Sequence, residues 1–306
     1  MNYEEYKEQT ELMLQILPLV MKEKEFALKG GTAINFFFRD MPRLSVDIDL
    51  TYLPITNRDE TLFKIDENLN KICDRVSELY PSYKINKKCL KGDKNIAFKL
   101  SIHNSKTQIK IEPNLILRGA CYPPVTKNLC ELARSEFKKD ISCLVMSSED
   151  IYGGKICAAL DRQHPRDLFD IKNLFKCGGI TETMLETFVV YLASGGRPMV
   201  ELLNPNFIDL KKSYDSTFKG MTSELVTVEE LERTRIQLVD EVQKGLTYHQ
   251  RKFLLSLKEG VPKYELLSIS HVSSFPAIKW KLLNIKKMSV KDHEKMVNKL
   301  RDVLDI

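Results

Sequence analysis

Apolar residues recur three and four positions apart over two long segments in the first part of the chain, residues 4–24 and 60–79. This spacing places apolar side chains along one face of an α-helix, so we predict a helix over each segment. Pro18 lies inside the first one and lacks a backbone N–H. It predicts a kink there, or a break into two helices.

Apolar and polar residues alternate over three shorter segments, residues 45–50, 95–103 and 107–117. Alternation is typical of a strand with one buried face, so we predict a strand at each segment. The turn-forming residues 104–106 connect the last two. These two strands are therefore predicted to form a hairpin.

Beyond residue 147 the pattern predicts helices and few strands. Ser147 or Ser148 can cap one helix, and Pro165 suits the first turn of the next. Cys177, Gly178 and Gly179 then mark a break. Further helices are predicted within residues 182–193, 199–203, 228–246 and 249–257. We therefore predict two domains, residues 1–178 and residues 179–306.

Candidate chemistry begins at the small-residue turn Gly30-Gly31-Thr32 and the predicted strand after it. Asp47 and Asp49 are two positions apart, so both project from the same face of that strand. A bound Mg²⁺ or Mn²⁺ would offset the repulsion between their carboxylates. Glycine lets backbone N–H groups approach phosphate oxygens. A phosphate cradle followed by a carboxylate pair outlines a site for nucleotidyl transfer.

Composition changes this picture little. The chain has 306 residues, with 47 Lys and Arg against 42 Asp and Glu, and its net charge of +5 is compatible with an RNA partner. The seven cysteines show no Cys-x-x-Cys pair, which argues against a zinc site or a disulfide framework and favours a reducing cytoplasm. The sequence starts without the features of a signal peptide and contains no apolar run long enough to span a membrane.

The glycine turn followed by Asp-x-Asp resembles the nucleotidyltransferase superfamily of DNA polymerase β type. Residues 29–33 and 43–50 together resemble one branch closely, the AbiEii/AbiGii-type toxins of bacterial toxin–antitoxin and phage abortive-infection systems. The resemblance continues in order through residues 197–198, 220–222 and 276–281. It implies an α+β fold, in which a polymerase β-type nucleotidyltransferase core with a mixed sheet and helices is followed by a helical C-terminal domain.

The resemblance also implies roles for individual residues. It adds Glu112, from a neighbouring strand, to the metal ligands, and gives Lys155 a contact with nucleotide phosphates and Asp167 a role in organising the site. The implied catalytic residues are Asp47, Asp49, Glu112, Lys155 and Asp167, and the first three of these are the implied metal ligands. We expect the nucleotide to be bound by Lys29, Gly30, Gly31 and Thr32. From their position beside the carboxylates alone, Arg43 and Ser45 are also expected to contact phosphates.

Each of the later assignments has a plainer alternative. Glu112 could be a solvated strand residue paired with Lys99 or Lys110. Lys155 could be solvated beside an Arg166–Asp170 pair on a surface helix, since these two residues are four apart. His164, next to a proline, is interpreted as structural or exposed to solvent.

The implied activity is Mg²⁺- or Mn²⁺-dependent transfer of a nucleoside monophosphate from an NTP to an acceptor, with the tRNA 3′ end as the acceptor suggested by relatives. The family also implies a cognate antitoxin of winged-helix type. A protein or small-molecule acceptor stays open, as does a non-catalytic nucleotide- or RNA-binding module on the same fold. Residues 279–301, rich in lysine beside Trp280, could bind RNA or form a solvated helix pair with Trp280 buried.

Overall fold

A computed structural model of the chain describes residues 2–90 and 96–306. The chain forms two compact units, each of which takes in two stretches of sequence. The first unit comprises Met1–Ser147 with Ser216–Leu225, and the second comprises Ser148–Asp215 with Val226–Ile306. The boundary predicted at residue 178 lies within the second unit, at a turn between two of its helices.

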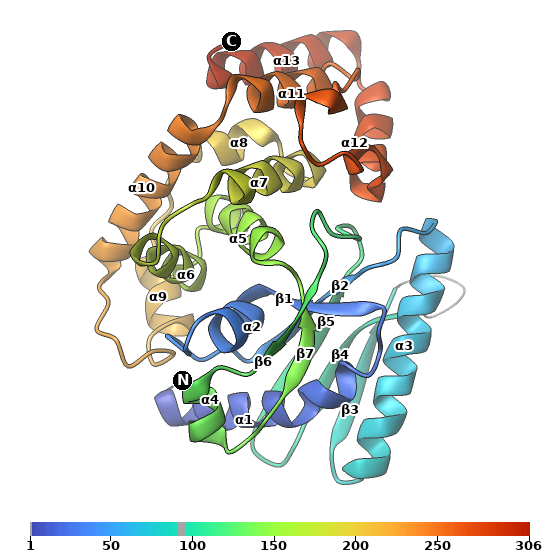
Figure 1. Cartoon of the computed structure of the whole chain (residues 1–306), viewed down its shortest axis with the longest axis vertical. Helices are drawn as coiled ribbons and strands as arrows, with labels where there is room; N and C mark the ends of the chain where they lie inside the picture. Colours follow the sequence, from blue (N-terminus) through green and yellow to red (C-terminus); the bar gives the residue numbers. More distant parts are fainter. Residues whose placement is uncertain (1, 91–95) are drawn as a thin grey trace. The chain divides into compact units, whose positions relative to one another are not determined.

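The described part of the first unit is built on one mixed sheet with strand order β3-β4-β5-β2-β1-β7-β6 (Figure 1). The central strand β2 pairs antiparallel with β1 and parallel with β5. The predicted hairpin is confirmed by antiparallel pairing of β4 with β5. The strands are β1 (Phe26–Lys29), β2 (Asp47–Tyr52), β3 (Lys84–Cys89), β4 (Ala97–His103), β5 (Gln108–Asn114), β6 (Val125–Asn128) and β7 (Ser142–Val145). Asn95, the first residue of one predicted strand, lies outside the described residues.

The two long helices predicted in this unit are α1 (Tyr3–Val20) and α3 (Arg58–Leu79), and their apolar faces are buried. The predicted break at Pro18 is wrong, because α1 is one continuous helix. Pro18 lies in its last turn. Its missing N–H removes a single bond, to the carbonyl four residues earlier, and the helix ends two residues later at Val20. The shorter helices are α2 (Gly30–Ala33), the π-helix η1 (Ile34–Phe38) and α4 (Glu131–Phe137).

The segment Ser216–Leu225 belongs to the first unit although it follows much of the second in sequence. The backbone N–H of Leu44 donates to the carbonyl of Met221 at 2.7 Å, and the Thr222 hydroxyl donates to the carbonyl of Pro42 at 2.8 Å. These bonds hold the loop that leads from η1 into β2. The Gly220-Met221-Thr222 motif therefore supports the strand that carries the two aspartates.

All regular secondary structure in the described residues of the second unit is helical, as predicted for the C-terminal part of the chain. Helix α7, whose residues Phe188 and Val189 are fully buried, packs closely against α5. The α-helices that follow β7 are α5 (Ser148–Arg162), α6 (Pro165–Lys176), α7 (Glu182–Ser194), α8 (Met199–Leu203), α9 (Lys211–Thr217), α10 (Val228–Gly245), α11 (Tyr248–Lys258), α12 (Pro276–Lys286) and α13 (Val290–Leu304). Threonine side chains cap α7, α10 and α11, which accounts for where these helices begin. None of the helices within the described residues has the length and apolar character needed to cross a membrane.

Candidate functional site

The glycine turn joins the end of β1 to the start of α2. Gly30 has a φ of +72°, a conformation that side-chain-bearing residues rarely adopt. A Cβ on Gly30 would lie 2.5 Å from Oδ2 of Asp49, well inside normal contact distance. Glycine is therefore required here for two reasons, the backbone conformation and the closeness of the Asp49 carboxylate.

The second glycine lies against a buried cation. A Cβ on Gly31 would be 2.6 Å from Nη2 of Arg43 and 3.1 Å from Oγ of Ser45. Arg43 is only 4% exposed, and its Nη1 donates to the carbonyl of Leu44 at 2.9 Å. On the helix side, the Asn35 side chain donates to the carbonyl of Gly31 at 2.9 Å. The turn is thus enclosed by Arg43 on one side and η1 on the other.

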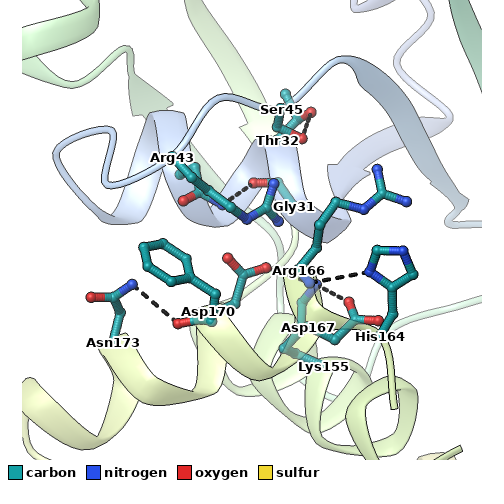
Figure 2. Close-up of polar contacts among 12 residues, drawn as sticks. Gly31, Thr32, Arg43, Ser45, Lys155, His164, Arg166, Asp167, Asp170 and Asn173 are labelled. Atoms are coloured by element: carbon teal, nitrogen blue, oxygen red, sulfur yellow. Dashed lines mark hydrogen bonds and ion pairs between the residues drawn. The ribbon is translucent and has the colours of Figure 1, made fainter. Parts of the chain in front are cut away.

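Thr32 connects this turn to the strand that carries the aspartates. Its Oγ1 lies 3.0 Å from Oγ of Ser45 (Figure 2). The same Oγ1 lies 2.5 Å from the backbone carbonyl oxygen of Asp47. The side chain is buried, so its hydroxyl serves contacts within the protein. In this structure Thr32 positions β2 relative to the glycine turn.

Asp47 and Asp49 lie on the same face of β2, as the alternation predicts. Both are partly exposed, whereas Ile48 and Leu50 between and after them are fully buried. Asp49 is paired in register with Lys29 on β1 and with Glu112 on β5. The sheet therefore brings three of the predicted site residues, Lys29, Asp49 and Glu112, to one level of neighbouring strands.

The carboxylate of Glu112 forms an ion pair with Lys99 of β4. Burial, together with the nearby charge of Lys110, lowers the pKa of Lys99, while Asp47 and Asp49 act in the opposite direction. In this structure Glu112 is therefore paired with Lys99, as in the alternative that gives Glu112 no metal-binding role. Within the described residues no three His, Cys, Asp or Glu side chains are grouped so that they could hold a metal ion. Asp47 and Asp49 still provide the oxygen donors that suit Mg²⁺ or Mn²⁺.

A second charged cluster lies inside the helical unit. Nζ of Lys155 on α5 is 2.7 Å from Oδ1 of Asp167 and 2.9 Å from Oδ2 of Asp170, both on α6 (Figure 2). All three side chains are at most 5% exposed. The alternative in which Lys155 is solvated is therefore wrong, because α6 buries it beneath two carboxylates. The ammonium is held within the protein in this structure.

Asp167 also binds a cation that the sequence did not single out. Arg162 donates from Nε to Oδ2 of Asp167 at 2.6 Å and from Nη2 to Oδ1 at 3.1 Å. Burial acts to raise the pKa of Asp167, but Lys155 and Arg162 together lower it well below the ordinary carboxyl range. Arg162 follows Lys155 by seven positions, which is two helical turns and the same face. This spacing of seven positions is the sequence signal by which Arg162 could have been predicted as a neighbour of Lys155.

His164 has the structural role expected of it. It caps α6, and its Nδ1 accepts a hydrogen bond from the backbone N–H of Arg166 at 3.1 Å.

Trp280 is 58% exposed, so the alternative in which it is buried within a helix pair is wrong. Asn35, whose side chain contacts the glycine turn, was not predicted, because no local pattern marks it.

Comparison with known proteins agrees with the resemblance found in the sequence. A family described as "Nucleotidyl transferase AbiEii toxin, Type IV TA system" matches residues 11–282. Among solved structures, MenT4, the nucleotidyltransferase toxin Rv2826c from Mycobacterium tuberculosis H37Rv, is similar, with a TM-score of 0.61 and 13% sequence identity. The alignment covers 98% of this chain and 94% of that one, and it supports the mixed α+β fold. No curated protein matches the sequence.

The family match spans nearly the whole chain, including the glycine turn, the aspartate strand and the Lys155 cluster. The chain therefore belongs to the AbiEii family of nucleotidyltransferase toxins of type IV toxin–antitoxin systems.

Proposed function

We propose that this nucleotidyltransferase toxin transfers a nucleoside monophosphate from an NTP to the 3′ end of tRNA, with Mg²⁺ or Mn²⁺ as the cofactor. The observation that carries the proposal is the closeness of the Asp49 carboxylate to Gly30, where an added Cβ would lie 2.5 Å from Oδ2. It puts a backbone that phosphate oxygens can approach directly beside a carboxylate that can bind a metal ion. A triphosphate and its cation need these two features within a few ångströms of each other.

Asp47 and Asp49 would hold the cation, since both project from one face of β2 and both are partly exposed. Bound there, a divalent cation would supply positive charge to the oxygen of the attacking acceptor hydroxyl and to the oxygen of the departing pyrophosphate. Glu112 is paired in register with Asp49 and would join them by exchanging its Lys99 partner for the metal. This exchange requires only side-chain movement on neighbouring strands.

The other residues of this unit would bind and orient the nucleotide. Backbone N–H groups at Gly30 and Gly31 would bind phosphate oxygens, with Lys29 adding a positive charge. Arg43 and Ser45 lie against Gly31 and would fix the shape of the turn, and Thr32 would fix its position relative to β2. The tight packing around Gly31 supports these positioning roles.

We assign Lys155 and Asp167 to the residues that transfer requires. A buried lysine between two carboxylates is costly to place in a fold and is held in one geometry by its partners. Clusters of this kind with perturbed titration are concentrated at functional sites. Asp167, fixed by Arg162 and Lys155, would organise the lysine, whose charge would act on nucleotide phosphates.

The family implies a cognate antitoxin and an NTP substrate. We propose that the antitoxin is a DNA-binding protein of winged-helix type. Its expression beside the toxin should restore growth.

The deciding experiment incubates the purified chain with each α-³²P-labelled NTP, Mg²⁺ and total bacterial tRNA. We expect label on tRNA from one preferred NTP. Asp49→Ala should abolish the label because it removes a proposed metal ligand. Asp74→Ala, which changes an exposed aspartate of α3, should leave labelling unchanged. Labelling of tRNA by a folded Asp49→Ala protein at the wild-type rate would contradict the proposal.

A second candidate, nucleotide or RNA binding without turnover, is favoured by the Lys99–Glu112 ion pair, which occupies the third carboxylate. It predicts NTP or RNA binding with no label on any acceptor. Label on protein instead of tRNA would keep the chemistry and change the acceptor. The same labelling assay therefore distinguishes transfer to tRNA, transfer to protein and binding without turnover.

A further inference from the structure

A small pocket in the helical unit brings together three lysines that the transfer reaction does not use. It has a volume of about 200 Å³ and is lined by residues on or next to α8, α11, α12 and α13. Lys258 ends α11, Lys281 lies on α12 and Lys299 on α13. The rest of the lining is mostly apolar and consists of Pro198, Met199, Val200, Met296 and Leu300, with Glu201. We call it the lysine pocket.

Lys258 is only 8% exposed, yet none of the described carboxylates lies within ion-pair distance of it. Its Nζ is 3.5 Å from Sδ of Met296, a weak acceptor. Lys281 donates to the backbone carbonyl of Gly195 at 2.6 Å and likewise has no described carboxylate partner. Glu201, the acidic residue of the lining, lies 3.8 Å from Nε of Arg197.

Two ammonium groups are thus held near each other in a largely apolar pocket. Burial, with the neighbouring charge of Lys258, lowers the pKa of Lys281 to about 8, and burial lowers the pKa of Lys258. An unpaired charge away from water is expensive, and proteins normally pair it or neutralise it. An anion bound in the pocket would remove both costs.

The geometry points to a phosphate monoester as the ligand of the lysine pocket. Each ammonium carries three donors that can rotate toward the oxygens of a tetrahedral dianion, whereas planar carboxylates are matched better by arginine. The volume is below the roughly 300 Å³ at which pockets for drug-sized ligands begin, so the group carrying the phosphate is small. The apolar lining favours a compact apolar body beside the phosphate. A small metabolite or the 5′ end of an RNA could supply this chemistry.

The test is calorimetric titration of the full chain, in phosphate-free buffer, with phenyl phosphate as the probe and phenol as the uncharged control. We expect phenyl phosphate to bind and phenol not to. Lys258→Met and Lys281→Met should each weaken binding about tenfold or more, because each removes a charged hydrogen-bond donor. Lys279→Met removes an exposed lysine of α12 that does not line the pocket, and it should leave the affinity unchanged.

A second readout guards against loss of binding through misfolding. Lys258→Met should raise the melting temperature of the ligand-free protein, since it replaces an unpaired buried charge with an apolar side chain of similar length. Absence of phenyl phosphate binding up to about 10 mM would overturn the proposal. So would equal binding by wild type, Lys258→Met and Lys281→Met, which would place the phosphate elsewhere, such as at the glycine turn.

The source of the phosphate is distinguished with a short RNA oligonucleotide bearing a 5′-phosphate and the same oligonucleotide with a 5′-hydroxyl. Tighter, Lys258-dependent binding of the phosphorylated RNA than of phenyl phosphate would assign the pocket to an RNA end. Tighter binding of phenyl phosphate would assign it to a small molecule. Neither readout depends on nucleotidyl transfer, so the inference and the proposed function can fail separately.

Discussion

Gly30 combines a backbone requirement with a chemical one. Its positive φ ends β1 and starts α2, while its missing side chain leaves room for the Asp49 carboxylate. Gly31 provides similar room for Arg43 and Ser45. Glycine at these two positions therefore supports both the turn and the placement of charged groups around it.

Gly30→Ala should abolish nucleotidyl transfer, because the added Cβ would displace the Asp49 carboxylate. It should also cost about 1–3 kcal/mol of unfolding free energy from the strained φ. Gly179→Ala is the matched control, since Gly179 has a φ of +78° and no atom within 4 Å of an added Cβ. Urea unfolding and tRNA labelling of both variants check this. Wild-type transfer by Gly30→Ala would show that the contact is not needed.

Asp167 is a residue whose protonation should affect stability in a defined direction. Its pKa is depressed below the ordinary value of 3.8, so its contribution is present above that pH and is lost as the pH falls. Asp167→Asn should cost about 3–5 kcal/mol at pH 7 because it disrupts a buried ion-pair cluster. This difference from wild type should begin to shrink in urea unfolding experiments once the pH falls below 3.8, and it should keep shrinking toward the depressed pKa of the folded state. A difference that stays constant with pH would exclude the ion-pair contribution.

At the level of elements, the fit of α5 against α7 depends on a glycine. A Cβ on Gly153 would lie 2.9 Å from the backbone nitrogen of Phe188, which cannot move without shifting α7. A Cβ on Gly154, one position along, would meet Cε1 of Tyr191 at 4.0 Å, an ordinary contact distance. The two neighbouring glycines therefore have different roles in the same helix.

Gly153→Ala should destabilise the protein by about 1–3 kcal/mol, since it overpacks a helix contact that includes backbone. Gly154→Ala should be neutral or stabilising by up to about 1 kcal/mol, because alanine is the better helix former and nothing obstructs it. Chemical unfolding of the two variants side by side tests the difference. Equal effects would mean that α5 and α7 do not pack in this register.

At the level of the whole molecule, none of the seven cysteines forms a disulfide bond, and their surroundings differ. Burial raises the pKa of Cys143 to about 12 and that of Cys130 to about 11, whereas Cys177 is exposed. A thiol reacts as its thiolate, so burial suppresses both access and ionisation.

We expect Cys177 to give the fastest reaction with a thiol reagent such as Ellman's reagent under native conditions. All seven thiols should react after unfolding, since none is in a disulfide. Cys177→Ser should remove the fast phase and leave the slower ones unchanged. A fast phase that survives in Cys177→Ser would show that another cysteine is more accessible than the structure indicates.

Local pattern was sufficient for most elements and for part of the candidate site. The alternation over residues 45–50 placed Asp47 and Asp49 on one strand face, and the motif around Gly30 identified the family. These features depend on neighbours in the chain, which the sequence gives directly. The π-helical form of η1 and the continuity of α1 through Pro18 were not evident, because both depend on how the helix ends are packed.

The sequence by itself determined the fold class, the same-face pair of aspartates and the family. Only the tertiary structure decided that Glu112 lies level with Asp49, that Lys99 occupies its carboxylate, and that Lys155 is buried beneath Asp167 and Asp170. The physical reason is that alternation fixes which face a side chain occupies. The neighbours it meets there are set by strand register and helix packing between segments distant in sequence.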